Sequence, residues 1–304
     1  MAATALIGID WGTSSARAYR IAADGGVLDT RTAPLGVQKL GGLDFPAALA
    51  HLLGDWSGDP APRLACGMVG SRQGWIEAAY VPCPAALPAL ATGLARTPGG
   101  ELSIVPGVTT RDAAGVPDVM RGEETEIIGA IAPEDERVLT VLPGTLSKWA
   151  RVERGRIVDF ETFMTGEVFA VLLEHSILGR LANAAASPRI GDAFRRGAER
   201  GCASGGLTHD IFGARTLALM GELAPDDVAD WLSGLLIGRE IRTARTWALR
   251  AGYDASRVRV IGADGLAERY VAALALLDVG AERGPPQSAA RGLWRIALAA
   301  DLLH

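Results

Sequence analysis

Cysteine is scarce in this chain of 304 residues, which contains only Cys66, Cys83 and Cys202. An odd, widely spaced set argues against a disulfide framework and against a zinc site. The chain also has no uninterrupted apolar run near the ~18 residues that a membrane span requires. Its start lacks the basic segment and long apolar stretch of a signal peptide. We therefore expect a cytoplasmic protein with no membrane partner.

An excess of basic residues is missing as well, because 30 Lys and Arg face 35 Asp and Glu, giving a formal net charge of -5. A nucleic-acid-binding chain would carry a concentrated basic face, so no nucleic acid is expected as a partner. The contents of apolar (49%), aromatic (6%) and charged (21%) residues exclude the disordered, collagen and coiled-coil classes. The length predicts roughly two domains.

The order of predicted elements indicates an internal duplication. The chain opens with three strands, the second and third joined by the hairpin signal Asp24-Gly25-Gly26. The resulting order β-β-β-α-β-α-β-α matches a ribonuclease H-like domain. Residues 137–163 repeat the opening as strand, Gly-Thr turn, strand, turn and strand. A polar break at Pro133–Glu136 predicts domains 1–133 and 134–304.

A G-x-x-x-x-G-K-[ST] P-loop is absent, and three other glycine turns follow predicted strands. In the first, Asp10 ends a strand and is followed by Gly12, Thr13 and Ser14, with Arg17 just beyond. Backbone N–H groups of such a turn can cradle phosphate oxygens, a carboxylate can hold Mg²⁺ through water, and arginine can reach a phosphate. The alternative is a plain hairpin turn with a capping acid.

The second turn lies in Leu142–Trp149, where Gly144 and Thr145 separate two predicted strands and Lys148 follows. Alone it would be an ordinary Pro-Gly turn. Its position in the second half is equivalent to that of the first turn, which favours a second phosphate loop.

The third turn is a Gly-x-x-Gly between a predicted strand and helix, formed by Gly262 and Gly265 and followed by Leu266. Glycines there let the backbone approach a flat ligand such as adenine closely. By itself this signal is weak.

Together the three turns resemble the phosphate and adenosine motifs of the actin, sugar-kinase and heat-shock ATPase superfamily. Within it, the chain resembles the 2-dehydro-3-deoxygalactonokinase family along almost its whole length. The phrases that carry the resemblance are IGIDWGTSSARAYR, ACGMVGSRQGWIEAAYVPCPA, VMRGEETEIIGA, VLPGTLSKWARV, DFETFMTGEVFAVLLEHSILG, LSGLLIGREI and IGADGLAERY.

This resemblance implies an α/β protein of two ribonuclease H-like domains, the actin-like ATPase (sugar kinase) fold, with an ATP cleft between them. It implies ATP- and Mg²⁺-dependent phosphorylation of 2-dehydro-3-deoxy-D-galactonate on its 6-hydroxyl, in galactonate breakdown. Asp10 would then bind Mg²⁺. The implied nucleotide-binding residues are Gly12, Thr13, Ser14 and Arg17 in the first loop, Gly144, Thr145 and Lys148 in the second, and Gly262, Gly265 and Leu266 in the adenosine turn.

The catalytic base is expected at the start of a predicted helix. Many related kinases place an aspartate there in a Gly-Gly-Asp phrase, whereas this chain has Arg121-Gly122-Glu123-Glu124. Glu123 is the closer positional match and Glu124 the alternative. Acids at a helix N-terminus also occur simply because they offset the helix dipole.

The carboxylate of a sugar acid calls for arginine or backbone donors. Arg121 and Arg72 are candidates, in loops at the ends of predicted strands, although either could be an ordinary surface arginine. Other residues that could shape the substrate pocket are Gln38, Lys39, Ser71, Trp75 and Tyr80.

Two alternatives stay open at this point. The first is a kinase for another sugar or for another 2-keto-3-deoxy acid, such as the gluconate epimer. The second is a non-kinase ATPase of the same superfamily that binds a protein partner. For a kinase, the expected partners are a small sugar acid and ATP, together with a second copy of the chain in a homodimer.

Overall fold

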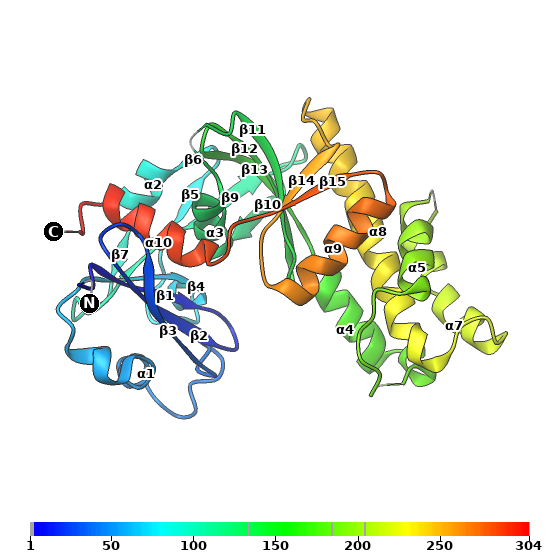
Figure 1. The fold of residues 1–304 in the computed structure, drawn as a ribbon, viewed down its shortest axis with the longest axis horizontal. Helices are drawn as coiled ribbons and strands as arrows, with labels where there is room; N and C mark the ends of the chain where they lie inside the picture. The colour runs from blue at the N-terminus through cyan, green and yellow to red at the C-terminus, as the bar shows by residue number, and fades with distance from the viewer. Residues whose placement is uncertain (1–2, 133, 184, 204, 304) are drawn as a thin grey trace. The chain divides into compact units, whose positions relative to one another are not determined.

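The computed structural model describes residues 3–132, 134–183, 185–203 and 205–303, and the chain divides into two compact units (Figure 1). Unit 1 comprises Met1–Glu136, Val152–Phe160 and Pro285–His304, and unit 2 comprises Arg137–Arg151 and Glu161–Gly284. Of the expected boundary segment, Pro133 lies outside the described residues. Two segments beyond that boundary, 152–160 and 285–304, belong to unit 1.

The main sheet of unit 1 has the strand order β3-β2-β1-β4-β8-β7. Its first three strands form an antiparallel meander, and β4 pairs in parallel with β1. This arrangement agrees with the three opening strands predicted from the alternating pattern and the Asp-Gly-Gly turn. The strands are β1 (Leu6–Trp11), β2 (Ala16–Ile21), β3 (Val27–Ala33), β4 (Arg63–Gly67), β7 (Ala95–Arg96) and β8 (Ser103–Ile104).

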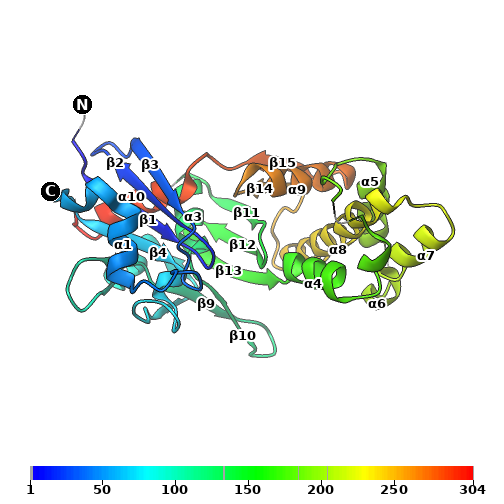
Figure 2. The ribbon, with the colours of Figure 1, turned by 90° about the horizontal axis from the view of Figure 1, so that it is seen from below.

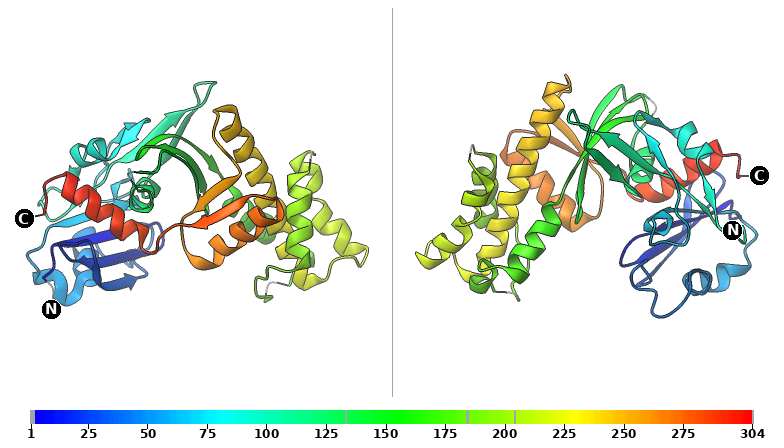
Figure 3. Two further views of the ribbon diagram at one scale, coloured as in Figure 1. Left: turned by 45° about the horizontal axis from the view of Figure 1, so that its top comes forward. Right: turned by 180° about the vertical axis from the view of Figure 1, so that it is seen from behind.

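The α-helices among the described residues of unit 1 are α1 (Phe45–Leu53), α2 (Leu87–Thr92), α3 (Glu123–Ala130) and α10 (Ser288–Ala299). Helix α10 packs against α3 (Figure 3). The contact is close enough to require glycine, because a Cβ on Gly129 would lie 1.9 Å from the Ser288 carbonyl oxygen. A Cβ on Gly292 would lie 1.9 Å from the Thr125 carbonyl oxygen. The C-terminal helix therefore supports the helix that carries the candidate base.

A small second sheet has the order β10-β9-β5 and is not part of the predicted element order. Its strands are β5 (Tyr80–Pro82), β9 (Gly107–Arg111) and β10 (Pro117–Met120). Strand β10 leads directly into Arg121 and α3.

The remaining sheet has the order β15-β14-β11-β12-β13-β6. Its strands are β6 (Ala85–Ala86), β11 (Arg137–Leu142), β12 (Ser147–Glu153), β13 (Arg156–Phe163), β14 (Arg257–Val260) and β15 (Gly280–Arg283). The parallel pairing of β11 with β14 brings the end of β14 beside the end of β11. The second and third glycine turns follow these two ends, so they become neighbours.

The helices of unit 2 pack around the long helix α8, and α5 runs along it (Figure 2). They are α4 (Thr165–His175), α5 (Asp192–Cys202), α6 (Leu207–Asp210), α7 (Gly213–Leu219), α8 (Val228–Arg250) and α9 (Asp264–Leu276). Among the described residues, no helix is both long enough and apolar enough to cross a bilayer.

Candidate active site

The first glycine turn is an exposed loop between β1 and β2. Asp10 and Arg17 face each other across the two strands. The Gly12 N–H donates to the Ser15 carbonyl oxygen at 3.0 Å, which closes the turn, and Thr13 and Ser14 are exposed. The turn therefore presents hydroxyl and backbone groups next to a carboxylate and a guanidinium, as its sequence predicts.

Gln38 lies against this loop through its backbone. Its N–H donates to the Thr13 carbonyl oxygen at 3.1 Å, and the Val37 N–H donates to the Gly12 carbonyl oxygen at 3.0 Å. A Cβ on Gly36 would lie 2.2 Å from the Thr13 carbonyl oxygen, so this approach requires glycine. The side chains of Gln38 and Lys39 are exposed.

The end of β4 brings the start of α3 toward Asp10. Strand β4 runs parallel to β1 with Cys66 opposite Asp10 and Gly67 opposite Trp11. Gly67 has φ +92° and Gly122 has φ +111°, both in the region that favours glycine. A Cβ on Gly122 would lie 3.2 Å from the Gly67 Cα. The carboxylates at the start of α3 consequently gather near Asp10.

The two adjacent glutamates of α3 have different surroundings. Glu124 is fully buried, and its carboxylate accepts hydrogen bonds from the Gly122 N–H at 2.7 Å and the Thr125 hydroxyl at 3.0 Å. Glu123 is half-buried, and its Oε2 accepts from the Arg121 N–H at 3.0 Å. Glu124 thus supports the helix start, while Glu123 is the more accessible carboxylate.

Burial raises the pKa of three carboxyl groups in this cluster. Burial, with a smaller contribution from the Glu123 charge, raises the pKa of Glu124 to about 8. Burial and then the Asp10 charge raise the pKa of Glu126 to about 8. The pKa of Asp10 is raised by burial, against the opposing effect of Arg17. Glu126 lies one turn along α3 from Glu123 and was not among the predicted site residues.

The two candidate arginines also differ. The Arg121 side chain is 8% exposed, its Nη2 donates to the Ala78 carbonyl oxygen at 2.8 Å, and its guanidinium lies 4.3 Å from the centroid of the Tyr80 ring. The Arg72 side chain is 87% exposed and pairs with Glu77 at 3.6 Å. Arg121 therefore contacts the end of the 71–80 loop at Ala78 and Tyr80, while its buried Nε and Nη1 have no hydrogen-bond partner among the described residues. Arg72 projects from the loop.

The other predicted substrate residues of this loop are partly structural. Trp75 stacks on Phe45 with ring centroids 5.9 Å apart and packs against the unit 1 core. The Ser71 Oγ is buried and has no hydrogen-bond partner among the described residues. Tyr80 begins β5 and is 39% exposed.

The second glycine turn, in unit 2, lies against the start of α4. The Glu167 N–H donates to the Thr145 carbonyl oxygen at 3.0 Å, and a Cβ on Gly166 would lie 2.6 Å from the Gly144 carbonyl oxygen. Thr145 is exposed. Lys148 follows within β12 and is only 3% exposed.

The third turn lies beside the second. The Ile261 N–H donates to the Val141 carbonyl oxygen at 2.9 Å, and Gly262 has φ +136°. Gly265 and Leu266 then lie in the first turn of α9. The two turns of unit 2 therefore come together.

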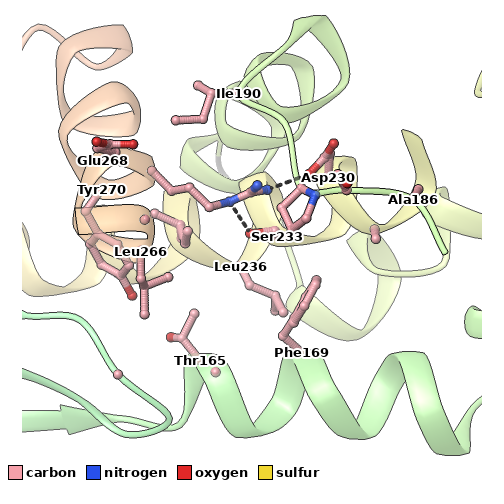
Figure 4. Close-up of a pocket in the computed structure, with 18 of the residues that line it drawn as sticks. Thr165, Phe169, Ala186, Ile190, Asp230, Ser233, Leu236, Leu266, Glu268 and Tyr270 are labelled. Atoms are coloured by element: carbon pink, nitrogen blue, oxygen red, sulfur yellow. Dashed lines mark hydrogen bonds and ion pairs between the residues drawn. The ribbon is translucent and has the colours of Figure 1, made fainter. Parts of the chain in front are cut away.

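A cavity of about 550 Å³ opens between these turns and helices α4, α8 and α9 (Figure 4). Gly144, Gly265 and Leu266, three of the predicted nucleotide-binding residues, line it. The wall also contains residues that the sequence analysis did not single out, among them Thr165, Gly166, Phe169, Ser233, Leu236, Arg269 and Tyr270. Thr165 and Gly166 lie in the phrase DFETFMTGEVFAVLLEHSILG, and this family-like phrase is the feature of the sequence that could have pointed to them.

Arg269, which forms an ion pair with Asp230, lines one side of this cavity. The Arg269 Nη2 lies 2.9 Å from Asp230, its Nε donates to the Ser233 hydroxyl at 3.2 Å, and its Nη1 donates to the Arg189 carbonyl oxygen at 3.3 Å. All three guanidinium nitrogens are therefore engaged. The cavity is apolar around Phe169, Leu236 and Leu266, a lining suited to a flat, largely apolar ring.

Three comparisons relate the chain to known proteins. The 2-dehydro-3-deoxygalactonokinase of Escherichia coli is 37% identical over 243 residues, covering 79% of this chain and 80% of the relative. A Rhizobium meliloti protein assigned as 2-dehydro-3-deoxygalactonokinase is 36% identical over 303 residues, covering 94% and 96%. A crystal structure from Sinorhizobium meliloti, assigned to the same activity, has a TM-score of 0.87 at 34% identity and covers 97% and 98%.

The structural likeness confirms the predicted actin-like ATPase (sugar kinase) fold. The sequence model of 2-keto-3-deoxy-galactonokinase matches residues 10–296, from the first candidate site residue into the last helix. The chain therefore belongs to the 2-keto-3-deoxy-galactonokinase family, a family of sugar kinases.

Proposed function

We propose that this protein transfers the γ-phosphoryl group of ATP to the 6-hydroxyl of 2-dehydro-3-deoxy-D-galactonate. The single observation that carries the proposal is the family match over residues 10–296, which includes every residue assigned a role. The reaction consumes ATP and the sugar acid and yields the 6-phosphate, ADP and one proton. The cytoplasmic location, the homodimer and the ATP cleft between domains stay predictions.

Glu123 is the proposed general base. It would accept the proton of the 6-hydroxyl as the oxygen attacks the γ-phosphorus. Its half-buried carboxylate near Asp10 supports this role. Glu124 has both oxygens occupied by Gly122 and Thr125, so it is the weaker candidate.

Asp10 is the proposed Mg²⁺ ligand. Mg²⁺ is usually held through one or two carboxylates together with waters and substrate phosphates. Asp10 fits this donor set, because its carboxylate lies beside an exposed loop of backbone and hydroxyl groups. Among the described residues there is no cluster of three or more acidic, His or Cys ligands that would make an all-protein cage. When bound, the ion would neutralise negative charge on the phosphate oxygens.

The cavity of unit 2 is the proposed adenosine site. Gly144, Gly265 and Leu266 line it, and its apolar wall suits a purine ring. Thr145 and the exposed loop Gly12–Ser14 are the proposed phosphate contacts, where backbone N–H groups and hydroxyls would bind the phosphate oxygens.

Arg72 is the proposed partner of the substrate carboxylate. It is exposed and its ion pair with Glu77 is long at 3.6 Å, which leaves its donors available. Arg121 would act by holding the loop, because its guanidinium already contacts Ala78 and Tyr80.

The test is ADP release from ATP and Mg²⁺ with a panel of acceptors. The expected result is turnover with 2-dehydro-3-deoxy-D-galactonate well above that with its gluconate epimer or a neutral hexose. Turnover that is greater with another acceptor would reassign the substrate. ATP hydrolysis that is independent of every acceptor would favour a non-kinase ATPase.

A further inference from the structure

A buried carboxylate lies behind the cavity of unit 2. Glu240, on α8, is 2% exposed. Its Oε1 accepts a hydrogen bond from the Trp149 indole N–H at 2.7 Å, and its Oε2 accepts one from the Tyr270 hydroxyl at 2.8 Å. The Tyr270 oxygen lies 2.8 Å from the Ser147 Oγ. The nearby Thr165 hydroxyl also favours the charged form of Glu240 and so opposes the rise of its pKa.

These bonds connect the elements that surround the cavity. Ser147 and Trp149 lie in β12, immediately after the second glycine turn, while Thr165 begins α4 and Tyr270 belongs to α9. Thr165 and Tyr270 line the cavity, whereas Glu240 does not. One side chain thus fixes three other elements relative to each other.

Burial of the Glu240 carboxylate costs free energy. Burial raises the pKa of Glu240 to about 7, although its hydrogen bonds oppose the rise. A well-packed apolar side chain of similar volume is often as stabilising as a buried charged group, or more so. Overall stability alone therefore does not explain the presence of a glutamate, and the need to hold particular partners in place does.

We propose that Glu240 is a positioning residue for nucleotide binding, holding the second glycine turn and Thr165 in register with α9 at the wall of the cavity. This inference rests on the proposed adenosine site. Glu240 does not line the cavity, so its effect passes through Ser147, Thr165 and Tyr270.

The directions of the hydrogen bonds predict which substitutions are tolerated. The Trp149 indole can only donate, and Tyr270 donates to Glu240, so Ser147 donates to Tyr270. In Glu240→Gln, the amide oxygen can accept from Trp149 while the amide NH₂ donates to the Tyr270 hydroxyl, which then donates to Ser147. The hydrogen-bond network is therefore kept, with the bonds between residue 240 and Tyr270 and between Tyr270 and Ser147 reversed in direction. In Glu240→Met, no acceptor remains for the Trp149 indole, and the Tyr270 hydroxyl keeps only Ser147 as a partner.

The experiment measures binding of a non-hydrolysable ATP analogue by calorimetry, the KM values for ATP and the acid, and thermal unfolding. In Glu240→Met we expect the Kd for the analogue and the KM for ATP to rise by about 10- to 100-fold, because misplacement by ~1 Å can cost about 10²-fold. The KM for the acid should stay within about twofold. Glu240→Gln should restore analogue binding to within about threefold of wild type.

Asp210→Asn is the matched control. Asp210 is 3% exposed and pairs at 2.6 Å with Arg200 and with Arg239, the neighbour of Glu240 on α8, but it does not line the cavity. It should lower thermal stability while leaving analogue affinity within about twofold of wild type. An equal loss of affinity in Asp210→Asn would make the effect of Glu240→Met a general consequence of instability and overturn the inference.

Should Glu240→Met fail to fold, the double variant Ser147→Ala with Glu240→Gln provides the test. In Ser147→Ala alone, Tyr270 still donates to Glu240. In the double variant Ser147 can no longer accept the Tyr270 proton, so Trp149 and Tyr270 compete for the single amide oxygen of the glutamine at position 240 and the loss of analogue affinity should exceed the sum of the two single losses. Additive losses would overturn the inference, as would a folded Glu240→Met protein with wild-type affinity. Wild-type protein that does not bind the analogue would instead refute the proposed function.

Discussion

Adjacent side chains can carry different roles when a helix turns them into different surroundings. Successive residues of an α-helix point about 100° apart. Glu124 accordingly points into the protein and accepts two hydrogen bonds, while Glu123 stays half-buried near Asp10. The sequence shows both acids at one helix start, but it cannot show which of them is enclosed.

Glu123→Gln should lower kcat by about 10²–10⁴-fold, the usual cost of losing a general base. Binding of ATP should change little, because the nucleotide cavity is lined by other residues. Glu124→Gln is the matched control and should lose much less, since glutamine can keep the bonds to the Gly122 N–H and the Thr125 hydroxyl. Turnover is measured at saturating ATP and acid. If Glu124→Gln were inactive while Glu123→Gln kept normal turnover, the general base would be Glu124.

Arg72 and Arg121 should separate into a binding and a supporting residue. Arg72→Ala should raise the KM for the sugar acid by about 10- to 100-fold, because a hydrogen bond to a charged group is worth about 1.5–3 kcal/mol. Its melting temperature should not change, since the side chain is 87% exposed. Steady-state kinetics and thermal unfolding of Arg72→Ala measure both quantities.

Arg121→Ala is the comparison for Arg72→Ala. It should lower the melting temperature, because it removes the bond to the Ala78 carbonyl oxygen and the contact with the Tyr80 ring. If Arg121→Ala were stable and raised the KM for the sugar acid more than Arg72→Ala does, Arg121 would be the binding residue and Arg72 the supporting one. Sequence reasoning placed both arginines near the site but could not distinguish a buried guanidinium from an exposed one.

Among helices and strands, the alternating patterns were the most informative feature of the sequence. The β1–β2–β3 meander and the β11–β12–β13 strands follow directly from them. Helix α5, which contains Gly197 and Gly201, was not predicted from the sequence. The structure gives the reason for these glycines. A Cβ on Gly197 would lie 2.0 Å from the Trp231 carbonyl oxygen in α8, so they permit close packing that a local pattern does not show.

The contact between α10 and α3 should transmit a packing defect to catalysis. Gly292→Ala places a Cβ 1.9 Å from the Thr125 carbonyl oxygen, so the helices must separate. We expect a loss of about 1–3 kcal/mol in the free energy of unfolding, typical of overpacking, together with reduced turnover, because α3 carries Glu123. Denaturant unfolding and kcat are the measurements.

Gly58→Ala is the control for Gly292→Ala. No heavy atom lies within 4 Å of the added Cβ, so the free energy of unfolding should change by no more than about 0.5 kcal/mol. Unchanged stability and turnover in Gly292→Ala would show that the helices can move apart without consequence for the site.

Considered as one chain, the protein keeps buried carboxyl groups in both units, and these link its stability to pH. Burial raises the pKa of Glu124 in unit 1 to about 8 and that of Glu240 in unit 2 to about 7. The folded state therefore retains these protons to higher pH than the unfolded chain does. Because the unfolded chain binds fewer protons in this window, the free energy of unfolding falls as the pH rises from about 5 to about 8.

Substitution by glutamine should reduce this dependence, since glutamine has no proton to lose, and the part that comes from Glu126, whose pKa is also raised to about 8, should remain. Each group contributes a slope of at most about 1.4 kcal/mol per pH unit. Glu124→Gln should flatten the curve up to pH about 8, and Glu240→Gln should flatten it up to pH about 7. The double variant should be flatter than either, because the two residues lie in different units and share no partner. Denaturant unfolding at several pH values measures the slopes. A double variant with the wild-type slope would mean that neither carboxyl group keeps its proton in the folded state, and that the pH dependence of stability arises from other groups.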